Sequence, residues 1–158
     1  MHRPASHLHR LDEVWISQPV FFVTTCTHGR RPLLANPQVW TIIENEFRSA
    51  PQRHGWRVGR YVLMPDHIHF FCACEQREEN SSLSCFVGAF KEWSAKGIIR
   101  TLGVSRPVWQ RQFFDHLLRS DESYDEKWNY VYANPVRAGL VETAGQWPYA
   151  GEIEVLRW

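Results

Sequence analysis

The pattern of apolar and polar positions along the chain predicts four β-strands. Each is a run rich in β-branched or aromatic residues that ends at residues typical of a turn or loop. The predicted strands span residues 19–27, 56–63, 67–74 and 108–118. Met64-Pro65-Asp66 has turn chemistry and separates the second strand from the third. We therefore expect these two strands to form a hairpin.

Helical spacing of apolar residues predicts three helices, over residues 37–50, 82–100 and 121–138. Asn36 suits an N-cap, and Pro37 suits the first helical position. Ser82 is expected to cap the second helix, and Gly139 lies where the third would end. The inner face of the second helix is expected to contain Leu83, Phe86, Val87 and Phe90, with Trp93 as a further candidate.

The order of these elements is strand, helix, strand, strand, helix, strand, helix. The first six give the βαββαβ order of a ferredoxin-like sandwich, an α+β fold with an antiparallel sheet and helices on one face. A C-terminal helix follows. The 158 residues, 44% of them hydrophobic, suit a single domain over 1–158. Its core is expected over about 15–142, with a tail over 143–158 that the pattern leaves unassigned.

Composition narrows the class of protein. No segment has the roughly 20 apolar residues that a membrane-spanning helix needs, and no apolar stretch follows the basic N-terminus. A cytoplasmic protein without membrane contact is therefore expected, with Cys26, Cys72, Cys74 and Cys85 as reduced thiols. The net charge is only +1, but 15 of the 18 basic residues are Arg and eight residues are Trp. Arg suits phosphate and stacks on bases, so nucleic acid is one candidate partner, and ordinary solvated surface is the other reading.

His67 and His69 are the first candidates for chemistry. Residues two apart on a strand point to the same face, so both imidazoles should project together as half of a metal site. Surface histidines without a ligand are the plainer alternative. Cys72 and Cys74 suggest a rival structural zinc site, but strand alternation directs them away from the two histidines. Buried cysteines that act as small apolar residues are another explanation.

A second set of candidates lies in the last strand and helix. Tyr130 and Asn134 are four residues apart and share a helix face, whereas Tyr132 lies about 200° round from Tyr130. Only one of the two tyrosines can therefore share a site with Asn134. Asp115 and His116 could join that site or form an ordinary polar pair at the end of a strand.

Three segments together resemble a known family. The chain resembles the HUH single-tyrosine transposases of the IS200-like group, above all the REP-associated tyrosine transposases. The segments that carry the resemblance are YVLMPDHIHFF, WQRQFFDH and NYVYANPVRAGLV. The resemblance covers about residues 15–145. It implies cleavage and rejoining of single-stranded or hairpin DNA through a covalent 5′-phosphotyrosine. A catalytically silent hairpin-binding protein with the same fold is the alternative.

The resemblance also implies roles for individual residues. His67 and His69 would hold Mg²⁺ or Mn²⁺, and Tyr130 would be the nucleophile. Asn134 would be a third ligand or a phosphate contact. Asp115 and His116 match the Asp-His of the family, and Lys91 matches a basic position that contacts phosphate. Two residues depart from the family pattern: Asp66 replaces the commoner Asn, and Tyr132 replaces a frequent His and adds a competing nucleophile.

The chemistry of these residue types agrees with this activity. A phenol has a pKa near 10 and needs a nearby cation to attack phosphate efficiently. Because a phosphotyrosine conserves the phosphodiester bond energy, no nucleotide-binding glycine loop is expected, and none is found. DNA contacts are expected from a set of arginines with Trp109 as a base-stacking residue. These arginines are Arg30, Arg31, Arg53, Arg57, Arg106 and Arg111. Whether the protein is a monomer or a homodimer stays undecided.

Overall fold

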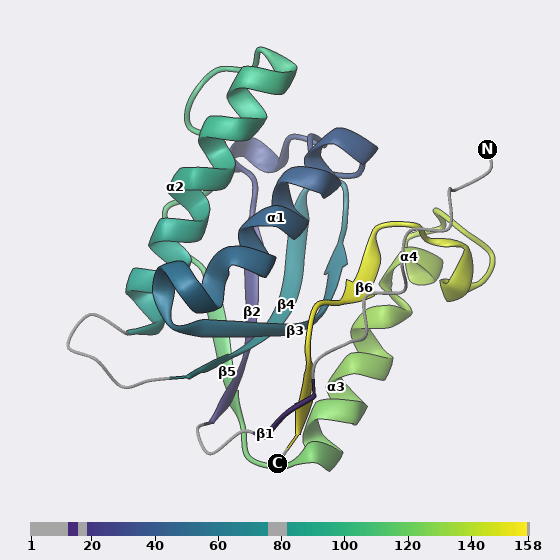
Figure 1. Ribbon diagram of the computed structural model, residues 1–158. Coiled ribbons are helices and arrows are strands. Elements are labelled where there is room, and N and C mark those ends of the chain that lie inside the picture. Colours follow the sequence, from purple (N-terminus) through teal and green to yellow (C-terminus); the bar gives the residue numbers. More distant parts are fainter. Residues whose placement is uncertain (1–12, 16–18, 76–81, 158) are drawn as a thin grey trace, which may run out of the picture.

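A five-stranded antiparallel sheet forms the centre of the computed structural model, which describes residues 13–15, 19–75 and 82–157 (Figure 1). The strand order is β5-β2-β4-β3-β6. The bounds are β2 Val20–Cys26, β3 Trp56–Leu63, β4 His67–Cys74, β5 Phe114–Leu118 and β6 Ala150–Glu152. The predicted hairpin is confirmed: β3 pairs with β4, and the Met64 N–H donates to the carbonyl of His67 at 2.8 Å.

Two long helices, α1 (Pro37–His54) and α2 (Leu83–Leu102), cover one face of this sheet (Figure 1). Both begin at the predicted caps. The Asn36 side chain accepts a hydrogen bond from the N–H of Val39 at 3.0 Å, and the Ser82 side chain accepts one from the N–H of Cys85 at 3.1 Å. The core between these helices and the sheet is strongly aromatic. It includes contacts among the rings of Phe47, Phe70, Phe86 and Phe90. The expectation that Trp93 belongs to this inner face is wrong, because its side chain is 44% exposed.

The third helix, α3 (Asp121–Tyr132), lies on the opposite face of the sheet. Its Tyr124 and Val131 are buried in a second apolar cluster with Phe22 and Phe71. The two helices of the predicted sandwich, α1 and α2, therefore lie on one face as expected, and α3, whose face the sequence left open, lies on the other. Helices pack on both faces of the sheet because its strands carry apolar residues on both sides.

The helix predicted over 121–138 is broken near its end. α3 stops at Tyr132, and a short helix, α4 (Asn134–Arg137), follows Ala133. Pro135 explains the break, since proline has no N–H with which to donate to the carbonyl of Val131 one turn earlier. Gly139, with φ at 73°, comes just after α4.

The last predicted strand is shorter than expected. β5 begins at Phe114, and of residues 108–113 only Trp109 forms a bridge, to Thr27. The 3₁₀ turns η1 (His28–Arg30) and η2 (Ala144–Gln146) add local structure. The tail that the sequence pattern left unassigned forms β6 and then β7 (Val155–Arg157), which pairs in parallel with β1 (Glu13–Trp15).

Gly59 lies at an irregularity in β3 that shapes the second apolar layer. The register with β4 shifts between Val58 and Tyr61. A Cβ atom on Gly59 would lie 2.6 Å from the hydroxyl oxygen of Tyr124 and 2.9 Å from the Cδ1 atom of Leu156. Both α3 and the C-terminal tail therefore approach the sheet closely only because residue 59 has no side chain.

The helices were compared with the length and hydropathy that a membrane-spanning helix needs. Over the described ranges 13–15, 19–75 and 82–157, no helix is both long enough and apolar enough to cross a membrane.

Candidate functional site

His67 and His69 lie on the face of β4 that α3 also covers. Ile68, between them, is fully buried in the opposite layer, as strand alternation predicts. The two imidazole rings meet edge to face with their centroids 4.8 Å apart. The sheet therefore brings the two predicted ligands together.

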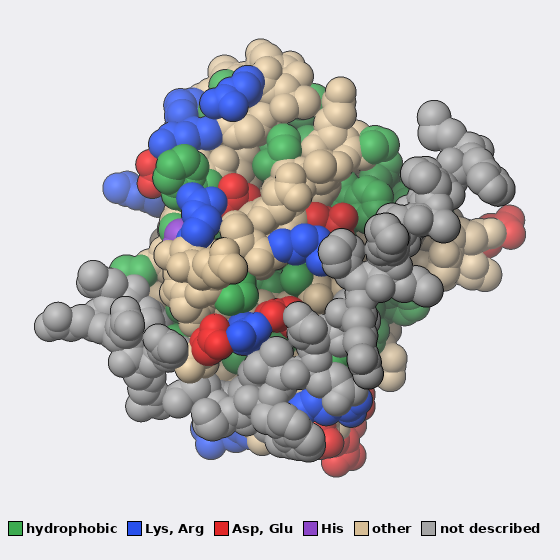
Figure 2. Space-filling view, in the orientation of Figure 1, with side chains coloured by type: hydrophobic (Ala, Val, Ile, Leu, Met, Phe, Trp, Pro, Cys, Tyr) green, Lys and Arg blue, Asp and Glu red, His purple; other side chains and the backbone are tan. Residues whose placement is uncertain are grey.

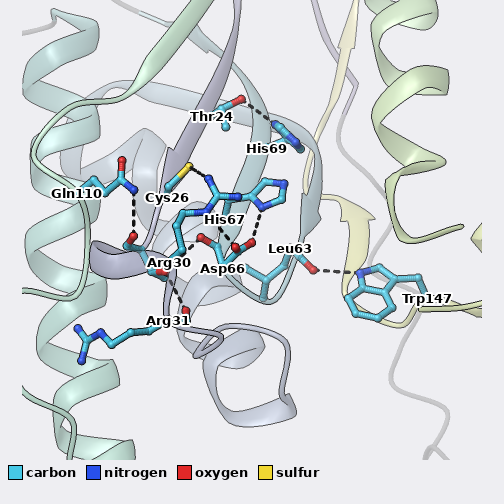
Figure 3. Close-up of polar contacts among 11 residues, drawn as sticks. Thr24, Cys26, Arg30, Arg31, Leu63, Asp66, His67, His69, Gln110 and Trp147 are labelled. Carbon is cyan, nitrogen blue, oxygen red and sulfur yellow. Dashed lines mark hydrogen bonds and ion pairs between the residues drawn. The ribbon is translucent and has the colours of Figure 1, made fainter. Parts of the chain in front are cut away.

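Both histidines use the same ring nitrogen in hydrogen bonds (Figure 3). Nδ1 of His69 lies 2.7 Å from Oγ1 of Thr24, and Nδ1 of His67 lies 2.8 Å from Oδ1 of Asp66. Within the part of the chain that the structure describes, neither Nε2 atom has a hydrogen-bond partner. This pattern suits metal ligation, in which the second nitrogen is held by a neighbouring acceptor or hydroxyl group.

Burial lowers the pKa of His69 to about 3, and the charges of His67, Lys127 and Arg137 act in the same direction. The ring stacks on Phe22 with a centroid distance of 5.3 Å. His69 is consequently neutral at physiological pH, which is the form that binds a metal ion.

Asp66 links the histidine pair to the turn after β2 (Figure 3). Its Oδ2 atom accepts from Nε of Arg30 at 2.9 Å, and Nη1 of Arg30 lies 2.9 Å from Sγ of Cys26. Burial raises the pKa of Asp66, but its hydrogen bonds with His67 and Arg30 outweigh that effect and lower the pKa. The carboxylate is therefore ionised and orients His67, as acceptors beside metal-binding histidines commonly do.

Tyr130 lines a shallow hollow of about 280 Å³ beside β5. The other residues that line it are His116, Leu118, Ser123, Glu126 and Lys127. The Tyr130 side chain is 63% exposed, an unusual position for a large aromatic residue in a folded domain. Tyr132 lies on another flank of α3, where its ring stacks on Trp128 at 5.1 Å. The structure thus separates the two tyrosines, as the helical repeat predicts.

Lys127 connects the hollow to the histidine pair, although the sequence pattern did not single it out. It lies one helical turn before Tyr130 and lines the same hollow. Its Nζ atom lies 4.8 Å above the centroid of the Phe22 ring, which in turn stacks on His69. The three-residue spacing from Tyr130 was the available signal, but only packing against Phe22 directs the charge toward the histidines.

The side-chain oxygen of Asn134 is hydrogen-bonded to the guanidinium group of Arg137. Its Oδ1 atom accepts a hydrogen bond from Nη2 of Arg137, and the same nitrogen donates to the carbonyl of Tyr130 at 2.7 Å. A guanidinium bound to this oxygen competes with a metal ion for it. Among the described residues, no group of three or more His, Cys, Asp or Glu side chains converges around the histidine pair or elsewhere. The assignment of Asn134 as third ligand stays a prediction.

Asp115 and His116 are separated by the alternation of β5. His116 pairs with Phe22 and lines the Tyr130 hollow, whereas Asp115 pairs with Val23 on the side of α1 and α2. Both side chains are exposed. Only His116 is therefore near the tyrosine, and Asp115 faces the other layer.

The predicted zinc alternative also depends on strand alternation. Cys72 is fully buried in the layer of α1 and α2, where burial raises the pKa of its thiol. Cys74 packs against the same cluster, so both thiols lie across the sheet from His67 and His69. These four side chains cannot form one tetrahedral site.

Two residues predicted to contact DNA have structural roles instead. Trp109 is only 6% exposed, and its Nε1 atom donates to Oγ of Ser94 at 2.9 Å, so it cannot stack on a base in this conformation. Nζ of Lys91 donates to the carbonyls of Gln110, Arg111 and Gln112 at 2.8, 3.3 and 3.0 Å. Burial lowers the pKa of Lys91. The ammonium group of Lys91 holds a loop, and its three donors are already used.

The predicted arginines divide into engaged and unengaged residues. Arg30 contacts Asp66, and Arg31 donates to the carbonyls of Ser105 and Pro107. Arg53 pairs with Glu46, and Arg57 with Glu75 and Glu154. Within the described ranges, the exposed side chains of Arg106 and Arg111 have no ion pair or hydrogen bond.

Known proteins share both the sequence pattern and the fold. Residues 18–131 match a family model described as "Transposase IS200 like". A Haemophilus influenzae protein named "Putative REP-associated tyrosine transposase" is 29% identical over 119 residues, which cover 67% of this chain and 66% of that protein. The Escherichia coli K12 REP-associated tyrosine transposase is 22% identical over 136 residues, 86% of this chain and 78% of the relative.

A solved structure agrees with these matches. A REP-associated tyrosine transposase bound to a REP hairpin superposes with a TM-score of 0.66 at 22% identity. The alignment covers 87% of this chain and 78% of that protein. The likeness confirms the predicted fold class. Since the family model matches most of the chain, and two named relatives agree with it, the chain belongs to the IS200-like transposase family.

Proposed function

We propose that this protein is a metal-dependent, single-tyrosine DNA transesterase that cleaves and rejoins single-stranded DNA next to a hairpin. One observation carries the proposal most directly. The exposed Tyr130 lies on α3, which covers the sheet face that carries the paired His67 and His69. Lys127 lines the Tyr130 hollow and also lies over the Phe22 ring that stacks on His69. A nucleophile, a ligand pair and a cation on one surface are the parts that phosphoryl transfer requires.

His67 and His69 would hold a divalent metal ion through their Nε2 atoms. The donor set fits, since each Nδ1 atom is already engaged and His69 is neutral at physiological pH. Asp66 would orient His67 and strengthen it as a ligand. A bound Mg²⁺ or Mn²⁺ ion supplies electrostatic polarisation of the scissile phosphate and stabilises its developing negative charge.

Tyr130 would be the attacking group. Its hydroxyl oxygen would form a bond to phosphorus while the bond from phosphorus to the 3′ oxygen breaks, which leaves a 5′-phosphotyrosine and a free 3′-OH. His116 and Glu126 line the same hollow and are the proton acceptors available to the phenol. Lys127 would hold positive charge beside the forming bond. Attack by a second 3′-OH would reverse the reaction and join two strands.

Hairpin DNA is the substrate that the relatives suggest. The solved relative is described as bound to a REP hairpin, and this chain shares its fold over most of its length. A hairpin next to a single strand would present an accessible phosphate to an open hollow, since Tyr130 lies on the surface and not in a closed pocket.

A covalent-trapping assay tests the proposal. End-labelled hairpins with single-stranded tails are incubated with the protein and Mn²⁺ and separated on a denaturing gel. We expect an adduct that EDTA abolishes and that Tyr130→Phe removes. Tyr132→Phe is the matched control, because the Tyr132 ring stacks on Trp128 away from the hollow, and this variant should retain activity. His67→Ala should abolish cleavage and leave DNA binding within a few-fold.

Other results would contradict parts of this proposal. An adduct that requires Tyr132 would move the nucleophile to the other flank of α3. Full activity of His67→Ala would remove the metal role of the pair. Tight hairpin binding with no adduct from the intact protein would favour a silent DNA-binding protein with the same fold.

A further inference from the structure

Arg30 lies beside the proposed metal ligands, and part of its guanidinium group is unused. Its Nε atom donates to Oδ2 of Asp66, and its Nη1 atom contacts Sγ of Cys26, both at 2.9 Å (Figure 3). Within the residues that the structure describes, Nη2 of Arg30 has no hydrogen bond. The side chain is 53% exposed. One edge of a firmly held guanidinium group is therefore open to a ligand.

Strand register places this guanidinium group on the face of the sheet that carries the histidine pair. Cys26 on β2 pairs directly with His67 on β4. Side chains of directly paired residues lie on the same face, with their Cβ atoms about 5 Å apart. Asp66, the other contact of Arg30, is hydrogen-bonded to Nδ1 of His67. Because Arg30 touches both of these neighbours, its guanidinium group lies next to the His67 ring.

The backbone holds Arg30 in this place before any ligand binds. The N–H of Thr27 donates to the carbonyl of Asp66 at 2.9 Å, which joins the turn after β2 to the turn before β4. A second bond of 2.9 Å, from the N–H of Leu34 to the carbonyl of Pro65, joins the same two segments. Arg30 itself has a φ of 54°, in the left-handed region that favours glycine. Such strain is concentrated at functional sites, so it points to a role for the Arg30 side chain.

Each end of the histidine pair has a cation beside it. Lys127 lies over the Phe22 ring that stacks on His69. Arg30 lies at the other end, beside His67. Figure 2 shows other Lys and Arg side chains gathered over α2, which packs on the opposite face of the sheet. Arg30 and Lys127 are therefore the cations placed to meet a phosphate group at the histidines.

Asp66 creates a need for positive charge at this point. Its carboxylate stands where the family pattern more often has Asn, and a negative charge next to a phosphate repels it. The ion pair with Arg30 offsets that repulsion. A guanidinium group can do more than this, because its planar fork has several donors and can bind a carboxylate and a phosphate at the same time.

We propose that Arg30 is a catalytic residue whose Nη2 atom donates a hydrogen bond to a non-bridging oxygen of the scissile phosphate. The inference rests on the proposed function and deepens it. The Tyr130 oxygen bonds to phosphorus as the bond to the 3′ oxygen breaks. The phenol proton passes to an acceptor in the Tyr130 hollow, and the released 3′ oxygen takes up a proton. Arg30 keeps its own proton and stabilises the negative charge that the phosphate oxygens gain in the transition state.

Single-turnover adduct formation at saturating tailed hairpin and saturating Mn²⁺ tests this role. Arg30→Gln should slow the reaction at least about 100-fold, the usual cost of one donor to a transition-state oxygen. If Arg30 only neutralised Asp66, Asp66→Asn would restore the rate, because no carboxylate would remain to be neutralised. We expect no such rescue. R30Q/D66N should lie as far below D66N as R30Q lies below the wild type.

A change in the DNA tests the same contact. After the wild-type protein has located the cleaved linkage, that phosphate is replaced by a methylphosphonate in either stereoisomer. In one stereoisomer the methyl group takes the place of the oxygen that faces Arg30, so the acceptor is already missing. On this substrate Arg30→Gln should cost no more than a few-fold in rate. On the other stereoisomer and on the natural phosphate, the same variant should show its full loss.

Binding and folding are measured separately. Arg30→Gln should bind the hairpin in EDTA within about threefold of the wild type by anisotropy, because the contact acts mainly in the transition state. Arg30→Gly should lose as much rate with no fall in its urea midpoint, since glycine adopts this φ without strain. Arg48→Gln is the matched control and should keep the wild-type rate. Arg48 also pairs with one carboxylate, that of Glu44, and its side chain is 46% exposed on α1, across the sheet.

Four results would overturn the inference while the proposed function stands. They are a wild-type rate for R30Q, recovery of the D66N rate in R30Q/D66N, an equal loss from R30Q on both methylphosphonates, and a loss of affinity as large as the loss of rate. Recovery in R30Q/D66N would make Arg30 a counter-ion of Asp66 and no more. Failure of the proposed function is a different result, in which the intact protein forms no Tyr130 adduct with Mn²⁺ present, and it removes the inference as well.

Discussion

The guanidinium group of Arg137 lies over the ring of Tyr130. Its guanidinium carbon is 4.0 Å from the centroid of the ring, and its Nη2 atom donates to the carbonyl of the same residue at 2.7 Å. The Tyr130 carbonyl belongs to the last turn of α3, where carbonyls lose their intrahelical donors, and the Arg137 side chain donates to it. A cation from α4 therefore fixes both the backbone and the ring of the proposed nucleophile.

Removal of this cation should slow cleavage more than it weakens DNA binding. For Arg137→Leu we expect the rate of adduct formation at saturating hairpin to fall about tenfold, a cost of about 1.4 kcal/mol in the transition state. Arg137→Lys should restore part of the rate, because lysine keeps the charge but lacks the planar fork. Single-turnover kinetics beside anisotropy binding separates the two effects. Equal losses in rate and affinity would instead identify Arg137 as a general DNA contact.

Asp66 should tune the affinity for metal through His67. Asp66→Ala removes the acceptor at 2.8 Å from Nδ1 of His67, and we expect the Mn²⁺ concentration for half-maximal adduct formation to rise about 10- to 100-fold. Asp66→Asn should have a smaller effect, because the amide oxygen can still accept from the imidazole N–H. The measurement is a Mn²⁺ titration of adduct formation for each variant. If Asp66→Ala titrates like the wild type, Asp66 does not act on the metal ligand.

The depressed pKa of His69 predicts a pH dependence of stability in the metal-free protein. An unfolded histidine has a pKa near 6.5, whereas the pKa of folded His69 is about 3. The unfolded state therefore binds an additional proton between these values, so stability present above pH 6.5 is lost as the pH falls. At pH 5 the loss from this residue should be about 2 kcal/mol relative to pH 8.

Urea unfolding in EDTA at pH 5 and pH 8 measures this loss. His69→Asn is the control, because asparagine does not titrate in this range and should reduce the difference between the two pH values. A wild-type protein and a His69→Asn variant with the same pH dependence would show that His69 is not the group responsible.

Gly59 should be intolerant of even one methyl group. A Cβ atom there would lie 2.6 Å from the hydroxyl oxygen of Tyr124, so Gly59→Ala should lower the free energy of unfolding by about 1–3 kcal/mol. Gly88→Ala is the matched control on α2, where the added carbon would meet no atom within 4 Å apart from its chain neighbours and the backbone of its own helix. That variant should stabilise the protein by about 0.5–1 kcal/mol, because alanine is the better helix former. Urea unfolding compares the two, and equal effects would contradict the close approach of α3 to β3.

Local periodicity carried much of the prediction. Strand alternation was sufficient to place His67 with His69 and to separate them from Cys72, and the helical repeat was sufficient to separate Tyr130 from Tyr132. The caps at Asn36 and Ser82 were predictable for the same reason, since each acts within four residues. These features depend on neighbours in the sequence, so the sequence alone determined them.

Contacts between distant segments were decided only by the tertiary structure. The sequence does not reveal that Lys91 donates hydrogen bonds to the carbonyls of residues 110–112 or that the buried Trp109 donates one to Ser94. Nor does it reveal that Lys127 packs over Phe22. It also left open the face on which α3 lies and the addition of the tail strand β6 to the sheet. In each case, the same side chain could have remained in solvent or found another partner. Packing of the two apolar layers selects one arrangement, because only that arrangement buries the aromatic residues and also satisfies the polar groups beside them.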